Sequence, residues 1–285
     1  MRPDEPAAIL APHPYAPAPY RVVARHAETP DTTTLVLRPV AGGAGPAVAP
    51  GQFNMVYAFG LGEVAVSVSG HDVPAGEIVH TVRSVGKISR SIGAARPGEV
   101  LGIRGPYGTG WPMAEAAGRD VLVVGGGLGL APLRPVILEL LRRRADFGRV
   151  EIIVGARTPS DLLYTGELAR WRAREDLRVQ VTVDSAGRDW YGDVGVVTRR
   201  LPDARFDPAK TVVFACGPEI MMRKTAEALA GLGLPESAIF LSMERNMKCA
   251  FAQCGHCQFG AAFICREGPV LSYARLRPML AVREL

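Results

Sequence analysis

Four of the five cysteines in this chain lie within 17 residues of one another, with the spacing C-x4-C-x2-C followed by x7-C. The N-terminal residues show no secretion signal, so we expect a cytoplasmic protein, and disulfides are rare in that compartment. Clustered thiols in a reducing environment usually bind a metal. The sequence therefore predicts a metal site whose ligands are Cys249, Cys254, Cys257 and Cys265.

Two kinds of metal site are compatible with these cysteines. The first three have the spacing of plant-type ferredoxin ligands, and the fourth completes the set for a 2Fe–2S cluster. Small residues such as Ala250, Ala252 and Gly255 lie between them and allow a short loop to turn its amides toward the sulfur atoms. The alternative is zinc, which also binds four thiolates and for which His256 offers a substitute ligand. The x4 gap favours the cluster, because zinc sites generally pair their ligands as two close couples.

A glycine cluster follows the apolar run Val121–Val124 in the middle of the chain. Glycines at the end of a buried strand let the backbone approach a ligand, and free amides at the start of the next helix bind phosphate. A plain tight turn is the alternative, and it would need fewer glycines. The nucleotide-binding residues predicted here are Gly125, Gly126, Gly127, Gly129, Ala131 and Pro132.

A second strand exit has the sequence Cys216-Gly217-Pro218-Glu219. Ligands of doubly wound sheets bind beyond the carboxyl ends of the strands, so two such exits indicate one crevice. Taken alone, Cys216 is most simply a buried core thiol. Arg157 follows another apolar run and is either a contact for a ribose or a 2′-phosphate, or a lone surface arginine.

Apolar runs and helical stretches alternate around these turns. The apolar runs lie at 121–124, 150–154, 178–183, 211–215 and 239–242, and the helical stretches lie at 131–144, 162–174, 194–201 and 219–231. This alternation predicts a five-stranded, parallel, doubly wound sheet. We expect residues 113–243 to form the nucleotide-binding α/β domain and residues 244–285 to form the metal-binding segment.

The first part of the chain has a different pattern. Short alternating or β-branched runs lie at 20–26, 32–38, 52–58, 64–69, 77–85 and 100–104, with turn residues between them. They predict a small antiparallel β-barrel over residues 20–112. Residues 1–19 contain six prolines and cannot form a helix, so we expect an extended tail. The tail either lies on the surface or docks on a partner subunit.

The composition excludes several classes of protein. With 48% hydrophobic residues and a net charge of +5, the chain is too apolar for global disorder. No run approaches the roughly 18 apolar residues of a membrane helix, so we expect no membrane insertion. The 33 basic and 28 acidic residues are scattered, which argues against binding of nucleic acid. No Ser-His-Asp order or carboxylate pair indicates a hydrolase.

The order of barrel, nucleotide sheet and four-cysteine segment resembles the ferredoxin–NADP reductase superfamily over about residues 20–275. The chain is most similar to the branch with a C-terminal 2Fe–2S cluster, which includes the gamma (diaphorase) subunit of cytoplasmic nickel–iron hydrogenases. The electron-transfer subunit of dihydroorotate dehydrogenase and the corresponding subunit of anaerobic sulfite reductase belong to the same branch. The motifs that carry the resemblance are Arg104–Gly108, Gly125–Pro132, Ala215–Pro218 and Glu244–Cys249, together with Cys254–Gly260.

The resemblance implies an FAD site on the barrel. Ser67 falls at the position that faces the flavin N5, whereas Val64 and Val66 replace the arginine and the aromatic residue typical of the family. Binding of the pyrophosphate would then depend on Gly86–Ser89, with Arg83 as an additional cation. The residues implied in FAD binding are Ser67, Val68, Ser69, Thr81, Val82, Arg83, Gly86, Lys87, Ile88 and Ser89.

The resemblance also gives the second strand exit a function. In this family the Cys-Gly-Pro turn lies close to the place where nicotinamide meets flavin. Cys216, Gly217 and Pro218, with Arg157, are thus implied in binding of NAD or NADP, and neither Arg157 nor Arg188 decides between the two nucleotides. Ser67 and Cys216 are implied as the residues nearest the reacting atoms.

The implied function is electron transfer among NAD(P)H, FAD and a 2Fe–2S cluster, with the cofactors carrying the redox chemistry. The expected partners are the iron–sulfur and catalytic subunits of a hydrogenase-type complex. One alternative is the electron-transfer subunit of a dihydroorotate dehydrogenase or sulfite reductase complex. The other alternative, from a different class, is a zinc-stapled nucleotide-binding subunit without redox turnover.

Overall fold

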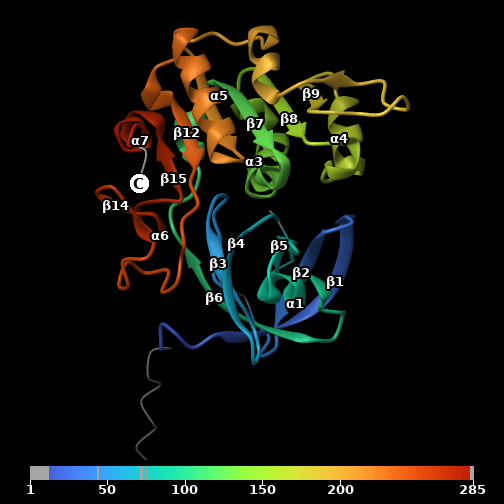
Figure 1. Ribbon diagram of the computed structural model, residues 1–285, viewed down its shortest axis with the longest axis vertical. Coiled ribbons are helices and arrows are strands. Elements are labelled where there is room, and N and C mark those ends of the chain that lie inside the picture. Colours follow the sequence, from blue (N-terminus) through green and yellow to red (C-terminus); the bar gives the residue numbers. More distant parts are fainter. Residues whose placement is uncertain (1–12, 44, 71–72, 75, 283–285) are drawn as a thin grey trace, which may run out of the picture.

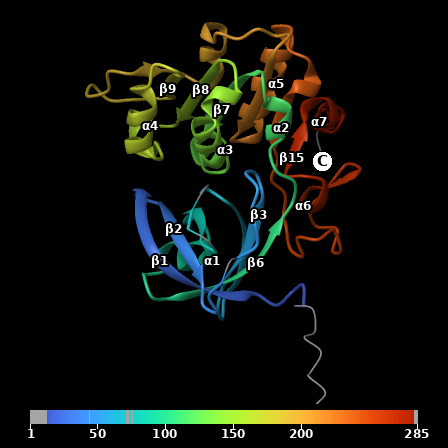
Figure 2. The same cartoon turned by 180° about the vertical axis from the view of Figure 1, so that it is seen from behind.

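The computed structural model describes residues 13–43, 45–70, 73–74 and 76–282. An antiparallel β-structure and a second sheet covered by helices stack on each other, and the C-terminal segment runs along one side of both (Figures 1 and 2). Within these ranges, no helix has the length and apolar character needed to cross a membrane.

The first layer is a six-stranded antiparallel sheet with the order β4-β3-β6-β1-β2-β5. Beyond the last residue of β4, Val68 bridges to His80, and the N–H of Ser69 donates to the carbonyl of Val79 at 2.8 Å. These contacts join the two edges of the sheet, so the six predicted runs form the expected barrel-like layer. The strands are β1 (Ala18–Thr29), β2 (Thr32–Pro39), β3 (Phe53–Ala58), β4 (Gly62–Ser67), β5 (Ile78–Arg83) and β6 (Val100–Tyr107).

Helix α1 (Lys87–Ala94) closes one end of this layer and was not predicted. Its Ile92 is fully buried in the barrel core beside Leu35, Leu37 and Val56. The helix begins at the Gly86–Ser89 segment, which we had expected only to bind pyrophosphate. Two apolar residues four positions apart, Ile88 and Ile92, were the signal for it.

The second layer contains the five predicted parallel strands in the order β9-β8-β7-β11-β12. After β7, the chain forms β8 and β9 on one side of that strand, and it then forms β11 and β12 on the other side. The sheet therefore has its topological switch point between β7 and β11. The strands are β7 (Asp120–Gly126), β8 (Val150–Ala156), β9 (Arg178–Val183), β11 (Thr211–Cys216) and β12 (Ile239–Ser242), with the short β10 (Asp193–Val194) beside β9.

Helices cover both faces of this sheet, as a doubly wound fold requires. Val121 and Val123 point to the face covered by α3 (Leu130–Arg142), whereas Leu122 and Val124 point to the opposite face. This alternation follows from the period of two along a strand. The first face also carries α2 (Met113–Ala116) and α4 (Thr165–Arg172), and the second carries α5 (Glu219–Gly231) and the 3₁₀ helix η4 (Val197–Asp203).

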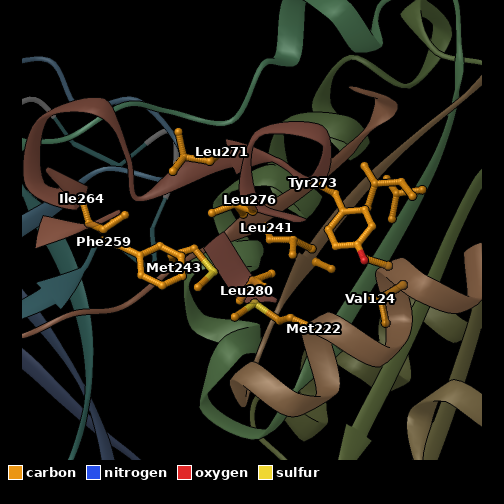
Figure 3. Close-up of a cluster of buried hydrophobic side chains, with 14 of the residues drawn as sticks. Val124, Met222, Leu241, Met243, Phe259, Ile264, Leu271, Tyr273, Leu276 and Leu280 are labelled. Carbon is orange, nitrogen blue, oxygen red and sulfur yellow. The ribbon is translucent and has the colours of Figure 1, made fainter. Parts of the chain in front are cut away.

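The C-terminal segment shares its core with the nucleotide sheet. Strand β15 (Val270–Ser272) pairs antiparallel with β12, so the sheet has seven strands and not the predicted five. Figure 3 shows Leu276 and Leu280 beside Leu241 and Met222, and Phe259 beside Met243. A run of three residues was too short to indicate a strand. The remaining elements are β13 (Gln258–Phe259), β14 (Ala262–Phe263), α6 (Ile264–Glu267) and α7 (Tyr273–Leu280).

The predicted N-terminal tail lies partly outside the described residues, which begin at His13. Within the described part of this tail, Tyr15 lies against the cysteine segment of the same chain. The Tyr15 hydroxyl donates to Oε1 of Gln253 at 3.0 Å, and its ring meets Phe251 edge-on with centroids 5.0 Å apart. Strand β1 then begins at Ala18.

Candidate functional site

The two predicted glycine-containing turns meet at the switch point of the nucleotide sheet. Cys216 lies directly opposite Gly125 in the register of β11 and β7. A Cβ atom at Gly129 would lie 2.3 Å from the carbonyl oxygen of Cys216 and 2.5 Å from the nitrogen of Gly217. Only glycine allows this backbone contact, because both neighbours are main-chain atoms. The structure thus brings the two strand exits together in one place.

The turn after β7 offers open backbone at its tip. Gly127 has φ +53°, and a Cβ atom placed there would have no neighbour within 4 Å. The turn forms a short 3₁₀ helix (Gly127–Gly129) that leads into α3, and amides at the start of a helix attract anions. Ala131 and Pro132 already lie within α3 and are buried, so their side chains are packed in the core and the exposed part of the turn is Gly127–Gly129.

The thiol of Cys216 is buried at the base of this crevice. Its sulfur lies 3.9 Å from the carbonyl of Ser242, and the residue is 5% exposed. Burial, with the nearby Glu244 as a second cause, raises the pKa of this thiol to about 12. It therefore stays protonated at neutral pH, and the side chain packs in the core of the nucleotide sheet. Arg157, at the end of β8, is exposed and pairs with Asp161 at 3.2 Å.

On the barrel, Ser67 is the last residue of β4, and its carbonyl oxygen contacts the imidazole ring of His80. Nδ1 of His80 lies 2.9 Å from the carbonyl oxygen of Ser67, and Nε2 lies 3.0 Å from Nδ2 of Asn54. His80 is fully buried, and this burial lowers its pKa to about 4. The neutral ring donates from Nδ1 to Ser67 and accepts at Nε2 from Asn54. Sequence reasoning missed this pair, although two polar residues within apolar strands were a signal for it.

The buried His80 gives stability a defined pH dependence. Its folded-state pKa, about 4, is below its ordinary value of 6.5, so the unfolded chain binds the extra proton first. Stability is complete above pH 6.5 and falls as the pH drops to 4, by about 1.4 kcal/mol per pH unit and roughly 3 kcal/mol in all. Urea unfolding between pH 4 and 7.5 measures this slope. The slope should be smaller in His80→Gln. It should be unchanged in His26→Gln, which alters an exposed histidine. Equal slopes in the wild type and both variants would contradict the assignment of this pH dependence to His80.

Two of the predicted flavin residues, Ser69 and Thr81, lie in a buried hydroxyl network between the layers. Thr81 Oγ1 lies 2.6 Å from the hydroxyl of Tyr164, 2.9 Å from Oγ of Ser69 and 2.9 Å from Oγ1 of Thr34. The backbone N–H of Tyr164 donates to Oε2 of Glu28 at 3.3 Å. Burial raises the pKa of Tyr164 to about 12, so its hydroxyl keeps its proton. The hydroxyls of Ser69 and Thr81 are therefore engaged in contacts within the protein.

An ion pair completes this interface between the layers. Arg134 on α3 donates to both carboxylate oxygens of Glu167 on α4 at 2.7 and 2.6 Å. It also donates to the carbonyl of Ser69 on the barrel at 2.6 Å, and its guanidinium lies 5.0 Å from the ring of Tyr164. Tyr164 itself has φ +52°, a strained conformation for a side chain of this size. These contacts fix how the nucleotide sheet sits on the barrel.

We expect Tyr164→Phe to weaken this interface without changing its shape. The change removes one hydroxyl from a buried network and should lower the free energy of unfolding by about 1–2 kcal/mol. Urea unfolding of the full chain measures the loss. Tyr191→Phe is the matched control, because Tyr191 is 96% exposed and loses no buried partner. Equal stabilities of the two variants would show that the Tyr164 hydroxyl carries no net interaction.

The segment predicted to bind pyrophosphate forms the start of α1. The N–H groups of Gly86 and Val85 donate to Oγ of Ser89 at 2.9 and 3.1 Å, so this hydroxyl caps the turn. Lys87 is exposed beside the first free amides of the helix, an arrangement suited to an anion. Arg83 is paired with Asp31, whose Oδ2 accepts from Nε at 2.7 Å. Its charge is thereby partly neutralised in the structure.

The apolar residues of the predicted flavin site differ in burial. Val68 and Val82 are buried in the barrel layer, 4% and 3% exposed. Ile88 is half-buried and faces the start of β4, where a Cβ atom at Gly62 would lie 3.1 Å from its Cδ1 atom. Of this flavin set, the structure thus leaves exposed surface at the start of α1, at the Ser67 end of β4 and on the side chain of Arg83.

The four clustered cysteines lie on one loop and the helix that follows it. Cys249, Cys257 and Cys265 are each 2% exposed, whereas Cys254 is exposed. The amides of Gln253 and Cys254 donate to the sulfur of Cys249 at 3.3 and 3.4 Å, and the amide of Ala252 donates to the sulfur of Cys265 at 3.1 Å. Ala250 and Ala252 have φ of +72° and +62°, which turns these amides inward.

The thiols affect one another's titration. Burial, together with the neighbouring Cys257 and Cys249, raises the pKa of Cys265 to about 12. Backbone hydrogen bonding from Cys249 lowers the pKa of Cys254. Among the residues the structure describes, no three His, Cys, Asp or Glu side chains are arranged as a metal centre. The donor set nevertheless fits a thiolate-bound metal, because backbone amides that point at the sulfurs of Cys249 and Cys265 suit charged thiolates.

Comparison with known proteins adds three findings. Residues 123–227 match the family model of the oxidoreductase NAD-binding domain. The chain is 35% identical over 230 residues to the sulfhydrogenase 1 subunit gamma of Pyrococcus furiosus, which covers 79% of each chain. It is 36% identical over 225 residues to a probable dihydroorotate dehydrogenase B (NAD(+)) electron transfer subunit of Methanothermobacter thermautotrophicus, covering 78% of this chain and 77% of that relative.

Solved structures share the fold over nearly the whole chain. The NADH-dependent reduced ferredoxin-NADP oxidoreductase matches with a TM-score of 0.73 at 23% identity, covering 93% of this chain and 94% of that one. The flavohaem-like FAD/NAD-binding domain of a nitric oxide dioxygenase from Vibrio cholerae matches with a TM-score of 0.70 at 18% identity, covering 79% of this chain. The match to the first structure thus extends beyond the two layers into the cysteine segment.

Proposed function

Because this chain belongs to the ferredoxin–NADP reductase-like family that contains sulfhydrogenase gamma subunits and dihydroorotate dehydrogenase electron-transfer subunits, we propose that it is the diaphorase subunit of a cytoplasmic nickel–iron hydrogenase complex. The chain is an oxidoreductase subunit of a family that uses NAD(P)H and flavin. The proposal adds the 2Fe–2S cluster on the four cysteines and the identity of the partner subunits.

One observation supports the proposal most strongly: the cysteine segment touches both layers. It shares a core with the nucleotide sheet through β15, and it contacts the barrel through Arg104, which donates to the carbonyl of Cys249 at 3.1 Å. A metal on this segment would therefore lie next to both layers, one predicted to hold the flavin and the other the nicotinamide. Cys254 is the cysteine at the surface, which suits transfer to a partner subunit.

The chain's residues would serve mainly to bind and orient the cofactors. The Gly127–Gly129 turn and the start of α3 would hold the pyrophosphate of the nicotinamide nucleotide, and Lys87 with the start of α1 would hold that of FAD. His80 fixes the Ser67 carbonyl and so the end of β4, where the flavin is expected. When bound, the cofactors supply hydride transfer and the division of an electron pair into single electrons.

Purification of the full chain without oxygen tests the cofactor part of the proposal. We expect the absorption of oxidised flavin with an iron–sulfur shoulder, iron and sulfide in stoichiometric amounts, and reduction of a viologen dye by NADH or NADPH. A colourless protein with stoichiometric zinc would instead support the alternative of a non-redox nucleotide-binding subunit.

Isolation from the native host tests the partner part. Copurification with hydrogenase subunits supports the proposal. A flavin-loaded protein that reduces viologen and copurifies with a dihydroorotate dehydrogenase subunit would support the second candidate, which the 36% identity to such an electron transfer subunit favours as strongly. The subunit that copurifies therefore decides between the two complexes.

A further inference from the structure

Arg104 is a buried cation at the junction of the barrel and the cysteine segment. The residue is 4% exposed, and its side chain forms a two-pronged ion pair with Glu63 at 2.9 and 2.6 Å. Burying a guanidinium is costly unless its donors are satisfied. Here each of its three nitrogens donates a hydrogen bond. The other acceptors are the carbonyls of Pro14 at 2.9 Å, Cys249 at 3.1 Å and Lys248 at 3.3 Å, and the hydroxyl of Tyr107 at 3.0 Å.

These acceptors come from segments that are far apart in the sequence. Glu63 lies on β4, Arg104 on β6, Pro14 on the N-terminal arm and Cys249 at the start of the cysteine loop. The rings of Tyr15 and Tyr107 lie 5.6 and 5.7 Å from the guanidinium carbon. The planar group therefore holds the N-terminal arm and the cysteine loop against the barrel at one point.

The carbonyl of Cys249 is the contact that matters for a metal. It belongs to the peptide group that joins Cys249 to Ala250, where the chain enters a left-handed conformation with φ +72°. The turn that starts there directs the amides of Gln253 and Cys254 at the sulfur of Cys249. This peptide group therefore lies at the entry to the turn that carries the inward amides.

We propose that Arg104 is a positioning residue for the metal site, holding the Cys249 peptide group so that the following turn presents its amides and Cys254 to the metal. The identity of the metal rests on the proposed function, but the positioning does not. Lysine keeps the charge and lacks the planar fork, so it cannot reach Glu63, Pro14 and Cys249 together. Arg104→Lys should therefore loosen the loop while leaving the local charge unchanged.

Release of metal from the full chain tests this proposal. The protein is loaded with Zn²⁺ alone, and transfer to a coloured chelator is followed in time. We expect Arg104→Lys to release zinc about 10–100-fold faster, as for outer-shell partners of metal ligands. The double variant Arg104→Met/Glu63→Gln leaves no unpaired charge and should also release it faster. Arg134→Lys is the matched control, because Arg134 holds Glu167 in the same two-pronged way away from the cysteines.

Hydrogen exchange distinguishes positioning from a general loss of structure. In the metal-free chain we expect faster exchange at the amides of Ala252, Gln253 and Cys254 in Arg104→Lys, with strand β12 unchanged. Wild-type zinc release in both Arg104 variants would overturn the proposal, and so would exchange that speeds up equally throughout the chain. If the isolated protein holds zinc and no flavin, the proposed function fails, yet these measurements still decide the role of Arg104.

The reduction potential of the iron–sulfur group is a further measurement, and a purely structural role of Arg104 would leave it unchanged. Glu63→Gln leaves the guanidinium without its carboxylate next to the cysteine loop. The added positive charge favours the reduced, more negative form of a reconstituted iron–sulfur group, so its reduction potential should rise. In Arg104→Met/Glu63→Gln the potential should return toward the wild-type value. An unshifted potential in Glu63→Gln would contradict the placement of this charge beside the metal.

Discussion

Cys254→Ser should abolish electron transfer from the chain to its partner subunit while NAD(P)H still reduces the bound flavin at the wild-type rate. Iron–sulfur clusters select soft thiolate ligands, and the hard hydroxyl oxygen of serine is a poor substitute for one of them. The hydride step takes place between nicotinamide and flavin and needs no ligand of the cluster. The two half-reactions should therefore separate completely in this variant.

Cys254 is the best of the four cysteines for this test. Cys249, Cys257 and Cys265 are each 2% exposed, so a serine at any of them would also put a polar group into the core. Cys254 is exposed, and its replacement should leave the free energy of unfolding of the metal-free chain unchanged. A loss of transfer in this variant is then attributable to the metal site and not to unfolding.

Stopped-flow absorption measures flavin reduction, and reduction of a one-electron acceptor protein measures transfer. Cys216→Ala is the control for metal content, since it removes the thiol of the cysteine outside the cluster without placing a hydroxyl group in the core. Iron and sulfide should be lost from the Cys254 variant and retained in the Cys216 variant. Partner reduction at the wild-type rate by Cys254→Ser would show that electrons do not pass through this site.

Local pattern predicted most of the scaffold. All six barrel strands and all five parallel strands were predicted from alternation and apolar runs, and the family resemblance drawn from the motifs is confirmed by relatives of 35% and 36% identity. Strand β15 was missed because its three residues become a strand only through pairing with β12. Helix α1 was missed because its first residues were assigned to a loop predicted to bind pyrophosphate.

The candidate site was predictable where glycine or cysteine spacing carries the chemistry. The meeting of the Gly129 and Cys216 turns followed from the rule for strand ends in doubly wound sheets. Arg104, Tyr164 and His80 were not predicted as site-forming residues, because each acts through partners far away in the sequence. The hydrogen bond from Arg104 to Cys249 joins residues 145 positions apart, and that from Tyr164 to Thr81 joins residues 83 apart. No local pattern encodes such contacts.

Gly129→Ala should disable binding of the nicotinamide nucleotide while leaving flavin and metal content intact. The added methyl group would lie 2.3 Å from the carbonyl oxygen of Cys216 and 2.4 Å from its carbonyl carbon, and neither is the end of a flexible side chain. The two turns must therefore move apart, by an amount approaching 1 Å to reach ordinary contact. A displacement of that size in a binding crevice costs about 100-fold in kcat/KM.

Gly125→Ala makes the same change four residues earlier, in strand β7 just before the turn, and is the matched control. There the Cβ atom would meet Leu133 at 3.4 Å and Leu130 at 3.5 Å, which is ordinary van der Waals contact, so the turn can stay in place. Viologen reduction with varied NADH or NADPH compares the two variants. A large loss in Gly129→Ala with near-normal activity in Gly125→Ala would place the nucleotide at the junction of β7 and β11. Equal losses would mean that any methyl group in or just before the turn blocks the ligand, and equal activity would mean that the nucleotide binds elsewhere.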